Sequence, residues 1–163
     1  MFTTKQAILD GSVKNPYLPN VQGVGYTGSG KYHTSGNRDN ICMYNRWAGV
    51  IERTYGTEEY YEKHPTYRYC TLHEPWLCYQ EFADWCFTNQ WYNRTYHLDK
   101  DLLVSGNKHY SPETCVLIPL ELNNFFNSPE YVGDAGLPTG VKWHSDERYP
   151  FYEVHLSKFG KKT

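Results

Sequence analysis

The sequence predicts an α+β fold in which aromatic-rich helices support a strand–strand–helix unit, followed by a small C-terminal antiparallel sheet. Three observations favour this prediction. Two segments, 40–55 and 75–88, repeat apolar residues at helical spacing. Segment 95–127 has the pattern of two short strands and a helix. Aromatic residues make up 17% of the chain, which is enough to build a core.

The N-terminal segment, residues 1–39, is rich in Gly, Asn, Ser and Thr and is expected to be partly flexible. Its stretch GSGK has part of a phosphate-loop pattern. However, Lys31 is followed by Tyr32 instead of Ser or Thr, and no apolar strand precedes the glycines. We therefore interpret the stretch as a glycine-rich loop.

Two helices are expected next. The first covers residues 40–55, has Asn40 as its N-cap, and carries an apolar stripe of Ile41, Tyr44, Trp47, Ala48 and Ile51. A polar, tyrosine-rich connection over 56–69 follows it. The second helix covers residues 75–88, with Pro75 at a favourable first position. Its stripe is Trp76, Tyr79, Phe82, Ala83 and Cys86, and both stripes are interpreted as core.

The strand–strand–helix unit begins with a strand expected over 95–104, which the turn SGNK ends. A short strand, TCVLIP, follows, and Pro119 then opens a helix, PLELNNFF. After a Gly- and Pro-containing linker, two strands are expected around SDERY. The predicted organisation is therefore residues 1–39, a central domain over 40–128 with its motif at 95–127, and a linker with a short β segment over 129–163.

Charge and hydropathy limit the partners. The net charge is −2, so the bulk composition does not indicate nucleic acid, although local basic patches can still bind it. No apolar run is long enough to span a membrane, and the first residues lack a signal-peptide pattern. We expect a cytoplasmic protein with no membrane partner. The sequence does not determine its oligomeric state.

The five cysteines are an odd number, which argues against a disulfide framework. Thiolate and imidazole groups are zinc ligands, so Cys70, His73 and Cys115 are candidates for a structural zinc site. The fourth ligand would be His64 or Cys78. Since no CxxC pair is present and Cys78 lies within a helical stripe, buried core thiols are the favoured interpretation.

The motif over 95–127 carries groups that suit phosphodiester chemistry. An acid at the end of a strand, Asp99, and an amide on the following helix, Asn123, can hold one Mg²⁺ or Mn²⁺, with Asp101 as a further acidic ligand. Such an ion stabilises the leaving 3′-oxygen, and a general base must activate water. The candidates for base or charge clamp are His97, Lys100 and His109. The alternative is a solvated strand face.

The stretch LDKDLLVSGNKHYSPETCVLIPLELN resembles phage-encoded HNH endonucleases, a group that includes many free-standing homing enzymes. Upstream, GVGYTGSGKY and PTYRYCTLHEPWLCYQEFADW look like their N-terminal region. The resemblance implies a ββα-metal motif, duplex DNA as substrate and a bacterial host cytoplasm. Asp99 and Asn123 match the metal-binding positions. Lys100 stands where the family has its general-base His, and Thr114 stands where it has Asn.

Downstream, LPTGVKWHSDERYPFYEVHLSKFGKK is similar to the opening strands of an ethylene-response-factor-type DNA-binding domain, here truncated. This resemblance implies that Trp143 contacts DNA, and the alternative is that Trp143 is a core residue of the terminal sheet. Basic side chains at Lys108, Lys158, Lys161 and Lys162 are expected to contact phosphate.

Two functions follow from these observations. The first is a phage-type HNH endonuclease that makes metal-dependent nicks or breaks in duplex DNA. The second is an HNH-like scaffold that no longer cuts, binds DNA or a host protein, and inhibits by occupancy. Lys100 and Thr114 favour the second function.

Overall fold

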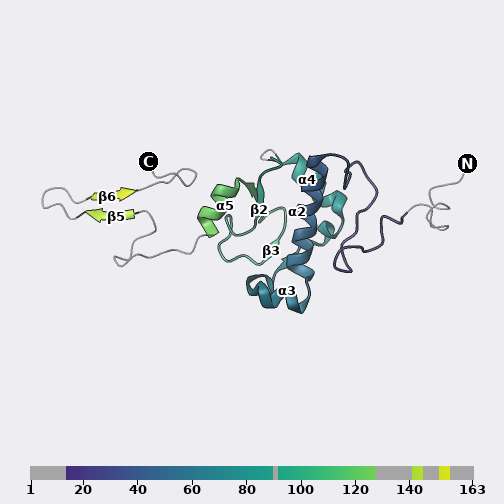
Figure 1. The fold of residues 1–163 in the computed structure, drawn as a ribbon, viewed down its shortest axis with the longest axis horizontal. Coiled ribbons are helices and arrows are strands. Elements are labelled where there is room, and N and C mark those ends of the chain that lie inside the picture. The colour runs from purple at the N-terminus through teal and green to yellow at the C-terminus, as the bar shows by residue number, and fades with distance from the viewer. Residues whose placement is uncertain (1–13, 90–91, 128–140, 145–150, 155–163) are drawn as a thin grey trace, which may run out of the picture. The chain divides into compact units, whose positions relative to one another are not determined.

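The structure is a computed structural model that describes residues 14–89, 92–127, 141–144 and 151–154. Its helices and small sheets make it an α+β protein (Figure 1). The chain forms two compact units, Met1–Pro119 and Leu120–Thr163, which are described separately below. Of the N-terminal segment expected to be partly flexible, residues 1–13 lie outside the described part of the chain.

The first helix, α2, spans Arg38–Tyr55 and begins two residues earlier than expected. Asn37, not Asn40, is its N-cap, because the Asn37 side chain accepts a hydrogen bond from the backbone N–H of Asn40. The prediction that Ile41 joins the core is wrong, since its side chain is 47% exposed. Ile41 lies about 200° around the helix from Met43, which is buried. The buried face of α2 is Met43, Trp47, Val50 and Ile51.

A short helix, α3, spans Glu58–Lys63 in the segment that was expected to be a polar connection. Thr57 caps it by accepting from the backbone N–H of Tyr60, and acids in its first turn and a lysine in its last complement the helix dipole. No residue of α3 is buried, so apolar periodicity could not have revealed it. A 3₁₀ turn, η1, covers Pro65–Tyr67.

The helix expected over 75–88 is broken into a 3₁₀ turn, η2 (Glu74–Leu77), and the helix α4 (Tyr79–Thr88). The break at Cys78 has a long-range cause. Tyr26 donates its backbone N–H to Leu77 O and accepts from the N–H of Tyr79, so the N-terminal segment takes the place of helical hydrogen bonds. The predicted stripe of this segment is nevertheless buried throughout: Trp76, Tyr79, Phe82, Ala83 and Cys86.

The core of the first unit forms where α2 packs against α4. Trp47 is fully buried, and its indole Nε1–H donates to Trp76 O at 2.8 Å. The Tyr79 ring meets the Trp47 ring edge-on, with centroids 5.6 Å apart. The Gln80 amide holds the glycine-rich segment on this core by bonding both the N–H and the C=O of Tyr32.

Four short strands lie among the described residues of the first unit. β1 (Thr71–Leu72) pairs in parallel with β3 (His109–Tyr110), and β2 (His97–Asp99) pairs antiparallel with β4 (Val116–Ile118). The strand expected over 95–104 therefore ends at Asp99. Residues 100–108 form a loop between β2 and β3.

The second unit contains the helix α5 (Leu120–Asn127) and a hairpin of β5 (Val141–His144) and β6 (Phe151–Val154). The hairpin is the small antiparallel sheet that the sequence predicted. The rings of His144 and Phe151 stack across it, with their centroids 4.7 Å apart. α5 follows β4 in the chain, but the two belong to different units. Within the described ranges, no helix is long and apolar enough to cross a membrane.

Candidate functional site

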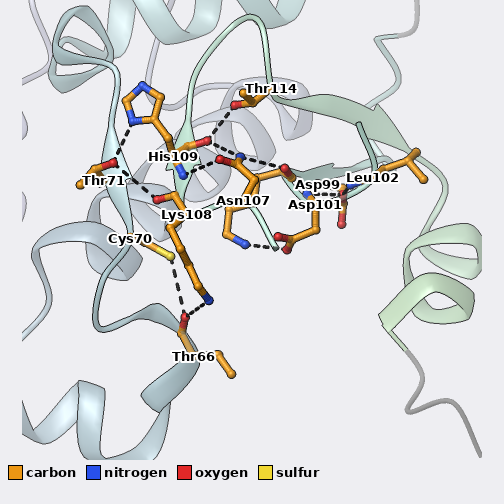
Figure 2. A network of polar contacts seen from close by, with 11 residues as sticks. Thr66, Cys70, Thr71, Asp99, Asp101, Leu102, Asn107, Lys108, His109 and Thr114 are labelled. Carbon is orange, nitrogen blue, oxygen red and sulfur yellow. Dashed lines mark hydrogen bonds and ion pairs between the residues drawn. The ribbon is translucent and has the colours of Figure 1, made fainter. Parts of the chain in front are cut away.

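β2 ends at Asp99, and the side chain of Asp99 bonds the backbone that follows the strand. The Asp99 carboxylate is buried, with the residue 6% exposed, and its Oδ1 accepts from the backbone N–H groups of Asp101 at 2.8 Å and Leu102 at 2.7 Å (Figure 2). An Asp that bonds backbone N–H groups just ahead of it starts a turn, which explains why the strand ends here. Oδ2 of Asp99 makes no hydrogen bond to any described residue.

Lys100 points inward. The residue is 6% exposed, and its ammonium lies 2.5 Å from Oδ2 of Asp101 and 5.8 Å from the centroid of the Tyr110 ring. A buried charge must be paired, and Asp101 supplies the partner. Lys100 is thus placed as an internal cation, and its charge offsets that of Asp101.

Asn107 ties the two ends of the loop together. Its amide nitrogen donates to Lys100 O at 2.9 Å and to His109 O at 2.6 Å, while its Oδ1 accepts from His109 N–H at 2.9 Å (Figure 2). The backbone at Lys100, next to Asp99, is therefore fixed beside the backbone at His109. Sequence reasoning did not select Asn107. A signal was available, since Asn two residues before a strand can bond the N–H at i+2.

His109 is the candidate base that the structure holds most firmly. Its carbonyl accepts a second bond, from Thr114 Oγ1 at 2.7 Å, and its ring Nδ1 lies 2.8 Å from Thr71 Oγ1. The residue is half-buried. Thr71 and Asn107 are the two site residues that the sequence interpretation missed. Thr114, which stands where the family has Asn, also belongs to this group of hydrogen-bonded residues, because its hydroxyl donates to His109 O.

The other predicted bases and DNA contacts are more scattered. His97 is exposed at the start of β2, on the same face of the strand as Asp99. Lys108 is exposed, and its ammonium donates to Thr66 O at 3.0 Å. Asn123 lies on α5 and Trp143 on β5, both in the second unit, so their relation to Asp99 stays a prediction. Lys158, Lys161 and Lys162 lie outside the described residues.

The zinc candidates do not form a metal site within the part of the chain that the structure describes, because no three His, Cys, Asp or Glu side chains are placed to hold an ion there. Cys70 and Cys115 are buried, and burial raises the pKa of the Cys70 thiol and raises that of Cys115 to about 12. His73 packs edge-on against Trp76, with ring centroids 5.9 Å apart. Both thiols are buried, as the interpretation of core thiols predicts, and a zinc site stays an untested alternative.

The buried thiol and phenol groups predict how the free energy of unfolding changes in alkaline solution. Burial raises the pKa of Cys86, Cys115 and Tyr79 to about 12, against ordinary values of 9.0 for the thiols and 10.0 for the phenol. Because the folded state binds these protons more tightly, their stabilisation is complete below pH 9 and is lost as the pH rises toward 12. We expect the free energy of unfolding to fall across this window in urea titrations. A Cys115→Ala variant should show a shallower fall, and an equal slope would contradict the assignment.

Asn107→Ala should open the loop. The change removes the three side-chain hydrogen bonds of Asn107, to Lys100 O, His109 O and His109 N–H. At roughly 0.5–1.5 kcal/mol each, we expect the free energy of unfolding to fall by about 2–4 kcal/mol in urea denaturation. Asn45→Ala, at an exposed position on α2, is the control and should change it by no more than about 0.5 kcal/mol. Equal effects of the two substitutions would show that Asn107 does not fix the loop.

Comparison with protein-family models, with curated proteins and with solved structures finds no match. The case for a function therefore depends on the chemistry of this site.

Proposed function

We propose that this protein is an HNH-type endonuclease that makes metal-dependent nicks or breaks in duplex DNA. The observation that carries the proposal is the fixed position of His109 beside the loop that begins at Asp99. Three hydrogen bonds hold the His109 backbone, one to its N–H and two to its carbonyl, and a fourth holds its ring. Preorganised groups of this kind are what hydrolytic chemistry requires.

His109 is the general base in this proposal, although the resemblance aligns Lys100 with that role. The Lys100 ammonium is paired with Asp101, and an ammonium has no free lone pair with which to accept a proton. His109 is only half-buried, and imidazole is the side chain most often used to accept a proton from water. His97 is the remaining alternative, exposed on β2.

The acids divide into two roles. Asp101 is neutralised by Lys100, which makes it a poor ligand for a divalent ion. Asp99 retains one carboxylate oxygen, Oδ2, outside its two backbone hydrogen bonds. Mg²⁺ commonly takes only one or two carboxylates and completes its shell with water and substrate phosphate, so this donor set fits Mg²⁺ or Mn²⁺. We propose Asp99 as a ligand, while Asn123 lies in the second unit and its role as a further ligand stays a prediction from the sequence. The bound ion would stabilise negative charge on the leaving oxygen.

A second candidate function is favoured by the Lys100–Asp101 pair. An internal ammonium beside the acidic end of β2 supplies a positive charge without any metal. An HNH-like scaffold stabilised in this way could bind DNA or a host protein and act by occupancy, without cleaving. Binding with no turnover would be its signature.

The deciding experiment is relaxation of supercoiled plasmid by the full chain in EDTA, Mg²⁺ and Mn²⁺, with a gel-shift assay on the same DNA in Ca²⁺. Relaxation only in Mg²⁺ or Mn²⁺ supports the endonuclease. A gel shift without relaxation in any metal overturns the endonuclease and supports the scaffold that binds DNA. Neither relaxation nor a gel shift overturns both DNA-directed functions.

A further inference from the structure

We propose that Thr71 is a positioning residue, which fixes the His109 ring so that Nε2 is the atom that accepts a proton. The inference rests on the proposed function only for its catalytic consequence. Its structural content concerns the ring itself and can be tested without DNA.

The geometry begins with the parallel pair of β1 and β3. Thr71 and His109 stand opposite each other in its register. Thr71 N–H donates to Lys108 O at 2.7 Å, which locks the strand on which the threonine lies. The Thr71 hydroxyl then reaches His109 Nδ1 at 2.8 Å and Lys108 O at 3.5 Å (Figure 2).

The hydroxyl has one proton to donate, and its direction decides the tautomer of the ring. If Thr71 donates to Lys108 O, its oxygen accepts from Nδ1–H, and Nε2 is left with a lone pair. If Thr71 donates to Nδ1 instead, Nε2 carries the hydrogen and cannot act as a base. The first arrangement satisfies three groups in one chain, from ring to hydroxyl to carbonyl, because a carbonyl oxygen has a second lone pair. We therefore assign the proton of the neutral ring to Nδ1.

Two charged side chains also lie around the ring, Glu113 and Lys108. Glu113 has a lowered pKa, caused first by its hydrogen bond from Ser111 and also by the nearby His73 and His109. Its carboxylate is therefore a negative charge near the ring. Lys108, the neighbouring cation, is turned toward Thr66 O. Orientation of a histidine by the partner of its other nitrogen is a general device in catalysis.

The step that this arrangement serves is hydrolysis of a phosphodiester. An O–H bond of water breaks, and its proton goes to His109 Nε2. The oxygen forms a bond to phosphorus, and the bond from phosphorus to the 3′-oxygen breaks. That oxygen leaves with the electron pair and takes a proton from solvent. Thr71 touches neither water nor phosphate, and so it acts only through His109.

The test is long-range ¹H–¹⁵N correlation of the His109 ring in wild type, Thr71→Val and Thr71→Ser. Valine keeps the shape and strand preference of threonine at this exposed site but removes the hydroxyl. We expect Nδ1–H in wild type, a mixture of tautomers in Thr71→Val, and recovery in Thr71→Ser. Thr66→Val, another exposed threonine beside the network, should leave the ring unchanged. A wild-type Nε2–H tautomer, or no change in Thr71→Val, would overturn the assignment.

The kinetics of plasmid nicking by the same Thr71 variants separate this inference from the proposed function. Thr71→Val should lower kcat for plasmid nicking by roughly 10–100-fold, with KM unchanged, as loss of an orienting partner does elsewhere. Thr71→Ser should restore it. If the ring shows the assigned tautomer but the wild-type protein nicks no DNA, the endonuclease is rejected. The conclusion that Thr71 orients the His109 ring is then retained. If nicking occurs and Thr71→Val leaves kcat unchanged, the positioning role is rejected.

Discussion

His109→Asn is expected to lower the rate of plasmid nicking by roughly 10²- to 10⁴-fold, the usual contribution of a general base. Asparagine places its amide close to where Nδ1 stood, so the contact with Thr71 Oγ1 can persist. The substitution thus removes Nε2 while leaving the backbone bonds of residue 109 in place. Single-turnover nicking of supercoiled plasmid in Mn²⁺ measures the effect.

The matched control is His97→Asn, which alters an exposed histidine on β2. If His109 is the base, His97→Asn should keep nearly full activity, and both variants should shift DNA on a gel equally. A large loss in His97→Asn with little loss in His109→Asn would transfer the role of base to His97. A weakened gel shift in His109→Asn would instead indicate a binding role for the ring.

Asp99→Asn and Asp99→Ala are expected to separate the two duties of this carboxylate. Asparagine keeps an oxygen that can accept from the N–H groups of Asp101 and Leu102, so the free energy of unfolding should change little. It removes the charge that would hold a divalent ion, and nicking should fall at least about 100-fold. Alanine removes both hydrogen bonds as well and should cost about 2–3 kcal/mol of stability.

Urea denaturation and nicking assays on the same preparations measure both duties. Asp84→Asn, which alters a surface acid paired with Lys31, is the control for loss of one negative charge and should leave both quantities nearly unchanged. Full activity in Asp99→Asn would remove Asp99 from the metal site. Unchanged stability in Asp99→Ala would show that its two backbone bonds do not end the strand.

The Lys100–Asp101 pair links the two candidate functions. In a site that cuts DNA, this pair supplies internal charge balance while His109 and Asp99 carry the chemistry. In a scaffold that does not cut, it takes over the stabilising role of a cation at the end of β2. The pair joins a buried lysine to a half-exposed aspartate and is expected to contribute little net stability, so its presence alone does not choose between the two functions.

The parts of the fold that follow from local periodicity were predictable. The stripe from Trp76 to Cys86 is buried as expected, because apolar residues at helical spacing must face one side. The short strand before Pro119 is present as β4, since its apolar residues and flanking turn signals are local features. The sequence also placed the acids and histidines in the segment that contains the site.

The remaining features were decided by pairs of residues far apart in the chain. Tyr26 bonds the backbone on both sides of Cys78 and so breaks the expected helix. Thr71 meets His109 only because β1 and β3 pair in parallel.

The same limit applies to the charged residues of the site. A run of charged residues after a strand gives the same sequence pattern whether its lysine side chain faces water or the protein interior. The packing around Tyr110 put Lys100 inside. The sequence by itself determined which groups are present and which helical face is apolar. The tertiary structure decided which groups meet, because hydrogen bonds and burial depend on neighbours in space that periodicity along the chain does not specify.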